Sequence, residues 1–386
     1  MAALARYSPA AVQSAAPRRQ RALHRCRASA AAAADVAPLS GPPAWYDHRA
    51  ATAEASAAVA AAHPSLAPLV RDGLLLALPR PSGYAERRDD GYEEPRAVWL
   101  LGTAHLSQRS AADVAAAVAA LAPEAVVVEL CRSRAGVMYA PANEAAAAGA
   151  LAMGGESFTA ALQRSVRLGG GGALLLRALL RTAAARAAGD VTAEATLGAE
   201  FAAAARAAEA TGATLVLGDR PVEVTLKRAL QAASTADRLR VARLLLPLVL
   251  PWAKPSQPQV NAAALDALLG DDDAISALFA RFAADFPSLA APLVHERDAY
   301  LAWSACRSKA VCGKAGVLAV IGAGHLRGVA WAVQNANGGA GLRFDALVGR
   351  RAPDPPLWRR LATDAALLGA TAAAWAATQP AHDAGL

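Results

Sequence analysis

Cysteine is scarce in this sequence. The 386 residues include four cysteines: Cys26 near the N-terminus, and Cys131, Cys306 and Cys312 far along the chain. This scattered set has neither the pattern of a disulfide framework nor the spacing of a zinc finger. The sequence therefore excludes a small disulfide-stapled domain, and the scarcity of cysteine suits a reducing compartment.

Acidic residues are absent from the first 34 positions. This segment carries six arginines, most of the formal net charge of +7, so the rest of the chain is nearly neutral and lacks the basic surface of a nucleic-acid-binding protein. Rich in Arg, Ala and Ser and without a hydrophobic core, residues 1–34 are typical of an organelle transit peptide. The Ala, Ser and Pro content favours a chloroplast, with a mitochondrion as the alternative destination. A disordered basic tail is the other interpretation.

Long hydrophobic runs are lacking as well. The apolar run near residue 244 is short and bounded by prolines, whereas a transmembrane helix needs about 20 apolar residues. Residues 361–378 are mostly apolar but are interrupted by Asp364. We predict a helical tail over residues 351–386 that packs on the protein or is amphipathic, with membrane association through 361–378 as the alternative.

Strand-like and helix-like segments alternate through the middle of the chain. Apolar runs at Leu74–Leu78 and Val98–Leu101 predict a pair of strands, and "AVVVELC" at 125–131 predicts a strand buried on both faces. The helical pattern between the last two runs completes a strand–helix–strand unit, whose strands must be parallel. Similar units begin near Gly198 and Val317. We therefore predict an α/β fold with a mixed, largely parallel sheet and flanking helices.

The predicted organisation has four parts. After the leader, residues 35–64 are expected to form a linker with at most a short helix. Residues 65–350 form the α/β domain, with a helical insertion at about 230–310, and the helical tail follows. Two local expectations accompany this plan: a last strand at "LRFDALVG", residues 342–349, and a capping box at Ser110 and Asp113.

A Gly-x-x-His motif follows two of the predicted strands. The stretch "VWLLGTAHLS" contains Gly102 and His105, and "VLAVIGAGHLRGV" contains Gly322 and His325. The glycines are expected to let the backbone turn sharply out of each strand, so that the imidazole stands at the edge of the sheet. The histidine of a single such motif more often has a structural role, but two motifs that both follow a buried strand favour a functional site.

Further polar residues stand where strands end. Glu129 and Asp219 join His105 and His325 in this position, and ligands of α/β proteins bind at the carboxyl ends of strands. The structural alternatives are a buried Glu129 paired with Arg132 or Arg134, and a plain turn in which Asp219 pairs with Arg220.

Three other charged residues are supporting candidates. Glu296 and Arg297 lie in a helical "HERD" segment, and they either reach the same edge or form a solvated helix face. Glu200 opens a helix, where the helix dipole favours a carboxylate whatever its function.

Two imidazoles and one or two carboxylates suit two kinds of chemistry. They match a hydrolytic divalent-metal site with an open position for water, in which manganese, cobalt or zinc is held by His105, Glu129 and His325. They equally suit metal-free acid/base chemistry, with His105 as general base and Glu129 orienting it. The residues alone leave both open.

Five ordered blocks resemble those of the TraB family. They are "GTAHLS", "PEAVVVELCRSR", "LGDRPVEVTLKRA", "ERDAYL" and "VIGAGHLRGV", and the resemblance covers about residues 96–349. The resemblance implies the fold of the wider TraB-like, Tiki-like and erythromycin-esterase-like group. Paired Gly-x-x-His motifs and a glutamate form the catalytic centre of the Tiki-type metalloproteases, which here implies His105, His325 and Glu129. In the esterase-like branch the first histidine is regarded as the base.

The resemblance leaves the activity open, because most TraB-domain proteins have no established reaction. The preferred expectation is a metal-dependent, peptidase-like hydrolase acting on a peptide or small molecule. The alternative is a non-catalytic regulator that binds a partner through the same cleft or acts at a membrane through its tail, and a purely structural edge is a third view. Bacterial family members often carry C-terminal membrane helices. The substrate and the oligomeric state stay open.

Overall fold

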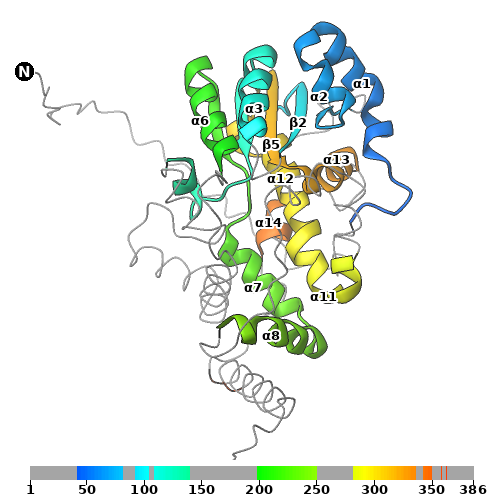
Figure 1. The fold of residues 1–386 in the computed structure, drawn as a ribbon, viewed down its shortest axis with the longest axis vertical. Coiled ribbons are helices and arrows are strands. Elements are labelled where there is room, and N and C mark those ends of the chain that lie inside the picture. Colours follow the sequence, from blue (N-terminus) through cyan, green and yellow to red (C-terminus); the bar gives the residue numbers. More distant parts are fainter. Residues whose placement is uncertain are drawn as a thin grey trace, which may run out of the picture. The chain divides into compact units, whose positions relative to one another are not determined.

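A five-stranded sheet with the order β1-β2-β5-β3-β4 organises the fold (Figure 1). The strands are β1 (Leu75–Ala77), β2 (Ala97–Thr103), β3 (Ala125–Val128), β4 (Thr214–Leu217) and β5 (Gly316–Gly322). The computed structural model describes residues 41–80, 92–103, 108–139, 198–249, 281–335 and 342–349, with Trp358 and Ala362. All of them belong to one unit, Ala37–Leu386.

Four of these strands run parallel. Only β1 is antiparallel, to β2, while β5 lies between β2 and β3 with Val320 opposite both Leu101 and Val128. The carboxyl ends of β2, β5, β3 and β4 therefore meet at one edge, which we call the carboxyl edge. The predicted mixed, largely parallel α/β sheet is confirmed.

Helices cover both faces of the sheet. On one face lie α3 (Gln108–Leu121) and α6 (Ala199–Thr211), side by side in Figure 1, and Leu318 and Val320 of β5 point toward them. On the other face lie α12 (Glu296–Cys306) and α13 (Leu326–Gln334), against Val317, Ala319 and Ile321. Because both faces are covered, β5 is buried along its whole length, which explains its uninterrupted apolar sequence.

The region predicted as a helical insertion is mainly helical where it is described. It contains the end of α7 (Val222–Ala232), then α8 (Thr235–Val249), α11 (Pro287–Ala290), a π-helical turn (Ala291–His295) and α12. However, α12 belongs to the core, because it lies on the sheet. No helix in the described ranges has the length and apolar character that a bilayer crossing requires. Most of the tail lies outside these ranges.

The expected linker at 35–64 is wrong for its second half. Residues His48–Ala62 form α1, a helix of 15 residues capped by Asp47, whose carboxylate accepts hydrogen bonds from the amides of Arg49 and Ala50. The hydroxyl of Ser56 accepts a hydrogen bond from the amide of Ala77 in β1. The alanine-rich sequence favours a helix, and this bond joins the helix to the edge of the sheet; α2 (Ala67–Arg71) follows.

Two local predictions are also wrong. The stretch "LRFDALVG" forms a short helix, α14 (Phe344–Val348), and no strand. The carbonyls of Leu347 and Gly349 at its end accept hydrogen bonds from Arg220 and Arg228, so side chains satisfy them in place of a neighbouring strand. The capping box at Ser110 fails because α3 already begins at Gln108.

Candidate functional site

Six charged side chains meet at the carboxyl edge, and we call them the edge cluster: Glu129, Arg134, Asp219, Arg297, Asp298 and His325. Glu129 follows β3 directly, Asp219 comes two residues after β4, and His325 ends the short 3-10 turn after β5. Arg297 and Asp298 come from the first turn of α12, which begins at this edge. Sequence positions about 200 residues apart are thus brought together by the ends of parallel strands.

Arg297 connects two carboxylates of the edge cluster. Its Nη2 donates to Oε1 of Glu129 at 2.7 Å and to Oδ2 of Asp219 at 3.0 Å, and its Nε donates to Oδ1 of Asp219 at 3.2 Å. Arg134 also donates to Oδ2 of Asp219, at 2.5 Å, and to the carbonyl of Glu129. Although burial disfavours the charged guanidinium, the two facing carboxylates outweigh that cost and raise the pKa of Arg297.

His325 lies between two carboxylates. Its Nδ1 is 2.5 Å from Oδ1 of Asp298, and its Nε2 is 3.3 Å from Oε1 of Glu129. Burial acts to lower the pKa of the imidazole, but the charges of Glu129 and Asp298 prevail and raise it to about 10. At neutral pH the ring is therefore protonated in the metal-free protein.

The two motif glycines have different roles at the carboxyl edge. The amide of Gly322 donates to Oε2 of Glu129 at 2.7 Å, which fixes the second oxygen of that carboxylate. A Cβ at Gly102 would overlap the side chain of Leu326. The φ of Gly322 is −60°, an ordinary extended value, so a special backbone conformation does not account for the glycine at this position.

The predicted site residues separate into three groups. Glu129, Arg134, Asp219, Arg297 and His325 converge in the edge cluster, while His105 lies outside the described residues. Arg220 and Glu296 are buried elsewhere, and Glu200 is buried at the start of α6. In place of the structural alternative, in which the Glu129 carboxylate pairs with Arg132 or Arg134, the carboxylate pairs with Arg297, and Arg134 donates to the carbonyl of Glu129.

Glu296 and Arg220 belong to a second ion cluster with Arg228, which we call the anchor cluster. Glu296 accepts hydrogen bonds from Arg220 at 2.7 Å and from Arg228 at 2.6 Å. Burial opposes ionisation of Glu296, but the bonds from Arg228 and Arg220 dominate and lower its pKa to about 2. The alternative of a solvated helix face is wrong for Glu296. The alternative of a turn with an Asp219–Arg220 salt bridge holds only in part, because the backbone amide of Arg220 donates to Oδ1 of Asp219 at 2.8 Å while its guanidinium pairs with Glu296.

A π-helical turn precedes these charged residues. Within Ala291–His295 the backbone bonds span one residue more than in an α-helix. The carbonyl of Pro292, in this turn, accepts a hydrogen bond from Nη2 of Arg220. The anchor cluster thus fixes the start of α12, where Arg297 and Asp298 enter the edge cluster.

Sequence reasoning missed Asp298 and Arg228. Asp298 lies next to Arg297 in "HERD", and a carboxylate close to a predicted edge residue was the available signal. Arg228 has no such signal, because only the fold brings α7 to Glu296. Cys131, Cys306 and Cys312 are all free thiols, as the absence of a disulfide framework predicts.

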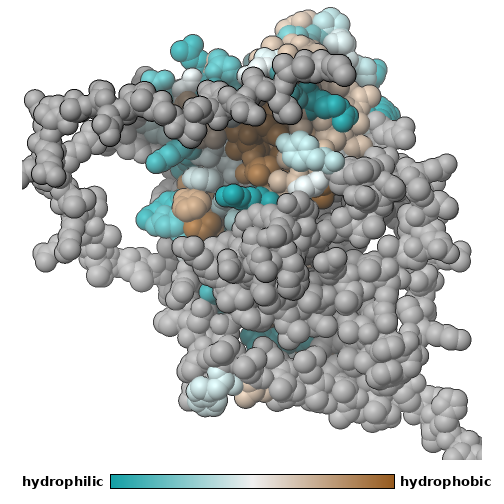
Figure 2. Space-filling view, turned by 90° about the vertical axis from the view of Figure 1, so that its left-hand side faces the viewer, coloured by the Kyte–Doolittle hydropathy of each residue, from teal (hydrophilic) through white to brown (hydrophobic). Residues whose placement is uncertain are grey.

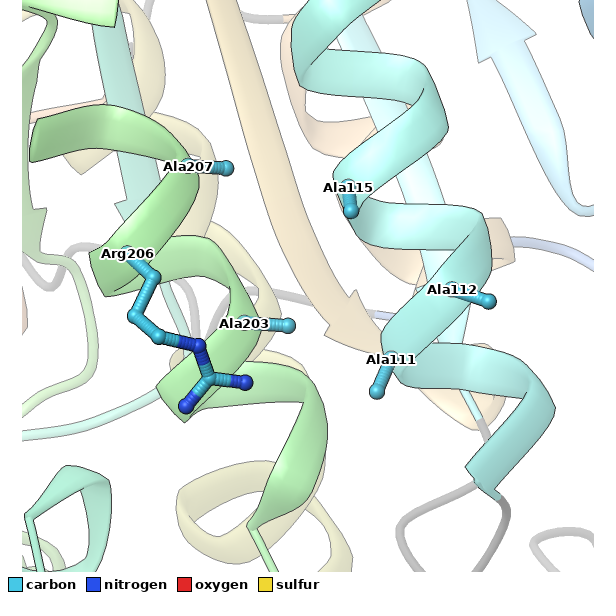
Figure 3. A pocket seen from close by; sticks show the side chains of 6 residues that line it. All are labelled: Ala111, Ala112, Ala115, Ala203, Arg206 and Ala207. Carbon is cyan, nitrogen blue, oxygen red and sulfur yellow. The ribbon is translucent and has the colours of Figure 1, made fainter. Parts of the chain in front are cut away.

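A cavity of about 460 Å³ lies between α3 and α6 (Figure 3). Ala111, Ala112 and Ala115 of α3 and Ala203, Arg206 and Ala207 of α6 line it. Figure 2 shows another view of the surface, in which hydrophobic residues of the described chain lie beside hydrophilic ones. The alanine methyl groups offer no catalytic or metal-binding chemistry, so the edge cluster is the candidate site.

Comparison with family models identifies one family for this chain. The model of the TraB/PrgY/gumN family matches residues 91–335, from just before β2 to just after α13. This range includes all members of the edge cluster. A comparison with curated proteins gives no match. With well over half of its length matched, the chain belongs to the TraB/PrgY/gumN family.

Proposed function

We propose that the edge cluster is the active centre of a metal-dependent, peptidase-like hydrolase with His105, Glu129 and His325 as its central residues. One observation carries the proposal: Oε1 of Glu129 and Nε2 of His325, from the ends of neighbouring strands, are 3.3 Å apart. Two ligands that each lie about 2.1 Å from one cation are separated by roughly 3 to 3.4 Å. The pair therefore has the spacing of two ligands of one ion.

The surroundings of this pair fit a metal site. A ligating imidazole usually donates its other N–H to a carboxylate, and Asp298 faces Nδ1 of His325 in that way. No group of three His, Cys, Asp or Glu side chains suited to an ion occurs within the described ranges. The third ligand in the proposal is His105, assigned from its motif. Manganese, cobalt and zinc are the candidates.

Each residue then has a distinct task. A bound divalent cation would polarise the carbonyl group of the substrate and activate a water molecule. Asp298 holds the ring of His325 and keeps the Nδ1 proton in place, while Gly322 fixes Glu129 through its second oxygen. Arg297 balances the charge of Asp219 and part of that of Glu129. Because His325 must lose its Nε2 proton to bind a cation, binding releases a proton.

Calorimetric titration of the chelator-treated full chain with manganese, cobalt and zinc tests the proposal. We expect binding that is lost in His105→Ala and His325→Ala and kept in His63→Ala, a matched control outside the cluster. Metal-dependent peptide hydrolysis should be lost in the same two variants. Hydrolysis by a folded protein that binds no metal would replace the proposal with acid/base catalysis in which His105 is the base.

A second function is favoured by the closed pairing of the edge cluster. Arg297 bridges Glu129 and Asp219 without any added ligand, so the cluster is also suited to a non-catalytic regulator that binds a partner. Absence of both metal binding and hydrolysis would favour this function. Membrane association through residues 361–378 belongs to it, and retention of the full chain on lipid vesicles, compared with a chain ending at residue 350, tests that part.

The leader is proposed to direct the protein to the chloroplast. The basis is the arginine-rich, acid-free composition of residues 1–34. A fluorescent protein fused to this segment should enter chloroplasts. Retention in the cytosol would contradict targeting, and import into mitochondria would replace the destination.

A further inference from the structure

We infer that the edge cluster binds a ligand carboxylate through Nη1 of Arg297, and that the substrate carries such a group near the reacting bond. The second part rests on the proposed hydrolase function. The first part rests only on the geometry of Arg297.

Basic groups form the accessible side of the edge cluster. The side chains of Arg297 and Arg134 are 20% and 16% exposed, whereas those of Glu129 and Asp219 are 6% and 4% exposed. In the remaining pair, His325 is 10% and Asp298 5% exposed. In each of these ion pairs of the edge cluster the carboxylate is the more buried partner. A ligand therefore meets N–H donors first, although positive and negative groups are mixed within the cluster.

Arg297 has donor capacity to spare. A guanidinium carries five N–H groups, and Nε and Nη2 are directed at Glu129 and Asp219. Among the described residues, the hydrogen-bonding partner of Nη1 is Nε2 of His325, at 3.5 Å. At least one of the two Nη1 hydrogens therefore has no acceptor in this part of the chain. An N–H group of an arginine that is accessible and free to donate can form a charge-assisted hydrogen bond with a ligand oxygen.

The guanidinium is also held in place before any ligand arrives. Two carboxylates fix its Nε and Nη2 edge, so little side-chain entropy is lost when Nη1 donates to a ligand. Charge-assisted bonds of this kind are stronger than neutral ones. The available edge is small, which favours one carboxylate oxygen over a phosphate dianion that needs several donors.

The position of Nη1 next to Nε2 of His325 links binding to the reaction. A carboxylate held there lies beside the proposed catalytic pair, so the bond to be cleaved is close to that carboxylate. A peptide with a free C-terminus and a small carboxylic acid both provide this chemistry.

The test compares N-acetyl-alanyl-alanine with its C-terminal carboxamide, using calorimetry on the full chain. We expect the acid to bind about tenfold or more tightly than the amide, the size of one charge-assisted hydrogen bond. Arg297→Gln should abolish this preference. Arg206→Gln, the same change at an exposed arginine outside the cluster, should keep it.

Arg297→Lys covers the case in which Arg297→Gln fails to fold. Lysine keeps the positive charge between Glu129 and Asp219 but has no second N–H edge, so the preference for the acid should still fall. Circular dichroism verifies folding. Equal binding of acid and amide by the wild type, or a full preference in the folded lysine variant, would overturn the inference.

Two further arms separate the inference from the proposed function. Inorganic phosphate that displaces the acid at equal concentration would show a general anion site and overturn the carboxylate assignment. Preferential binding of the acid without hydrolysis of any peptide would leave the binding inference standing and remove the hydrolase. Equal hydrolysis of free and amidated peptides would leave the hydrolase standing and remove the binding inference.

Discussion

Glu296 and Arg297 are neighbours on α12, yet they serve two ion clusters of different character. In the anchor cluster the side chains of Arg220 and Glu296 are 0% and 1% exposed. The arginines there also donate to the carbonyls of Pro292, Leu347 and Gly349. In the edge cluster, by contrast, Arg297 is 20% exposed and keeps an N–H edge toward His325.

The contrast separates a structural ion cluster from a candidate site. The anchor cluster joins α7, the π-helical turn, α12 and the end of α14 through side-chain and backbone acceptors, and it leaves no access for a ligand. The edge cluster stands at the ends of the strands, where its basic side is accessible. Burial of charge by itself therefore does not identify a site, whereas an accessible edge with spare donors does.

The largest loss of stability is expected from removing the negative charge of the anchor cluster. Glu296→Gln leaves Arg220 and Arg228 buried without a counter-ion, and breaking a buried pair costs about 3 to 5 kcal/mol. Glu129→Gln in the edge cluster should cost less, about 1 to 3 kcal/mol, because water reaches its partners. Urea denaturation of both variants measures the difference. Arg281→Gln, on an exposed helix surface, is the control and should change stability little. Equal losses in the two clusters would remove the distinction between them.

The two clusters should also respond to opposite ends of the pH range. The pKa of Glu296 is lowered from 4.5 to about 2, so its stabilisation is complete above about pH 4.5 and is lost as the pH falls toward 2. The pKa of His325 is raised from 6.5 to about 10. Its stabilisation is complete below about pH 6.5 and is lost as the pH rises through 10.

Thermal unfolding of the chelator-treated protein from pH 2 to 11 measures both losses of stability. Glu296→Gln should weaken only the loss of stability at acid pH, and His325→Gln only the loss at alkaline pH. If His325→Gln loses stability at alkaline pH just as the wild type does, groups other than His325 cause that loss.

The fold could be predicted from the sequence because its strands are buried on both faces. Uninterrupted apolar runs such as 125–128 and 316–322 identify β3 and β5. The prediction failed for α14, where Arg220 and Arg228 satisfy the carbonyls at the helix end. It failed for α1 because alanine contributes to helices and to linkers alike. The failure at α14 thus depends on distant partners that no local pattern contains, whereas the failure at α1 arises from the composition itself.

The site could be predicted in part. Strand ends at one edge must meet, which brought Glu129, Asp219 and His325 together in the prediction and does so in the structure. The partners on α12 could not be assigned, since the direction of each side chain depends on the π-helical turn before it. A shift of one residue in the register of α12 decides whether Glu296 or Arg297 faces the carboxyl edge.

The smallest change in stability is expected at Gly328, and it sharpens the comparison because it affects the edge cluster alone. A Cβ at this position would overlap the carboxylate of Asp298, which must then move away from Nδ1 of His325. Replacing a helical glycine with alanine normally stabilises by about 1 kcal/mol, so the clash and the gain in Gly328→Ala should nearly cancel in the free energy of unfolding. The pKa of His325, followed by NMR, should nevertheless fall, because one of the two carboxylates that raise it is displaced. Combining Gly328→Ala with Asp298→Ala removes the clash, and the added alanine should then stabilise the protein relative to Asp298→Ala alone. An unchanged His325 pKa in the single variant would mean that Asp298 does not govern the imidazole, and that the link between α12 and the proposed catalytic pair is absent.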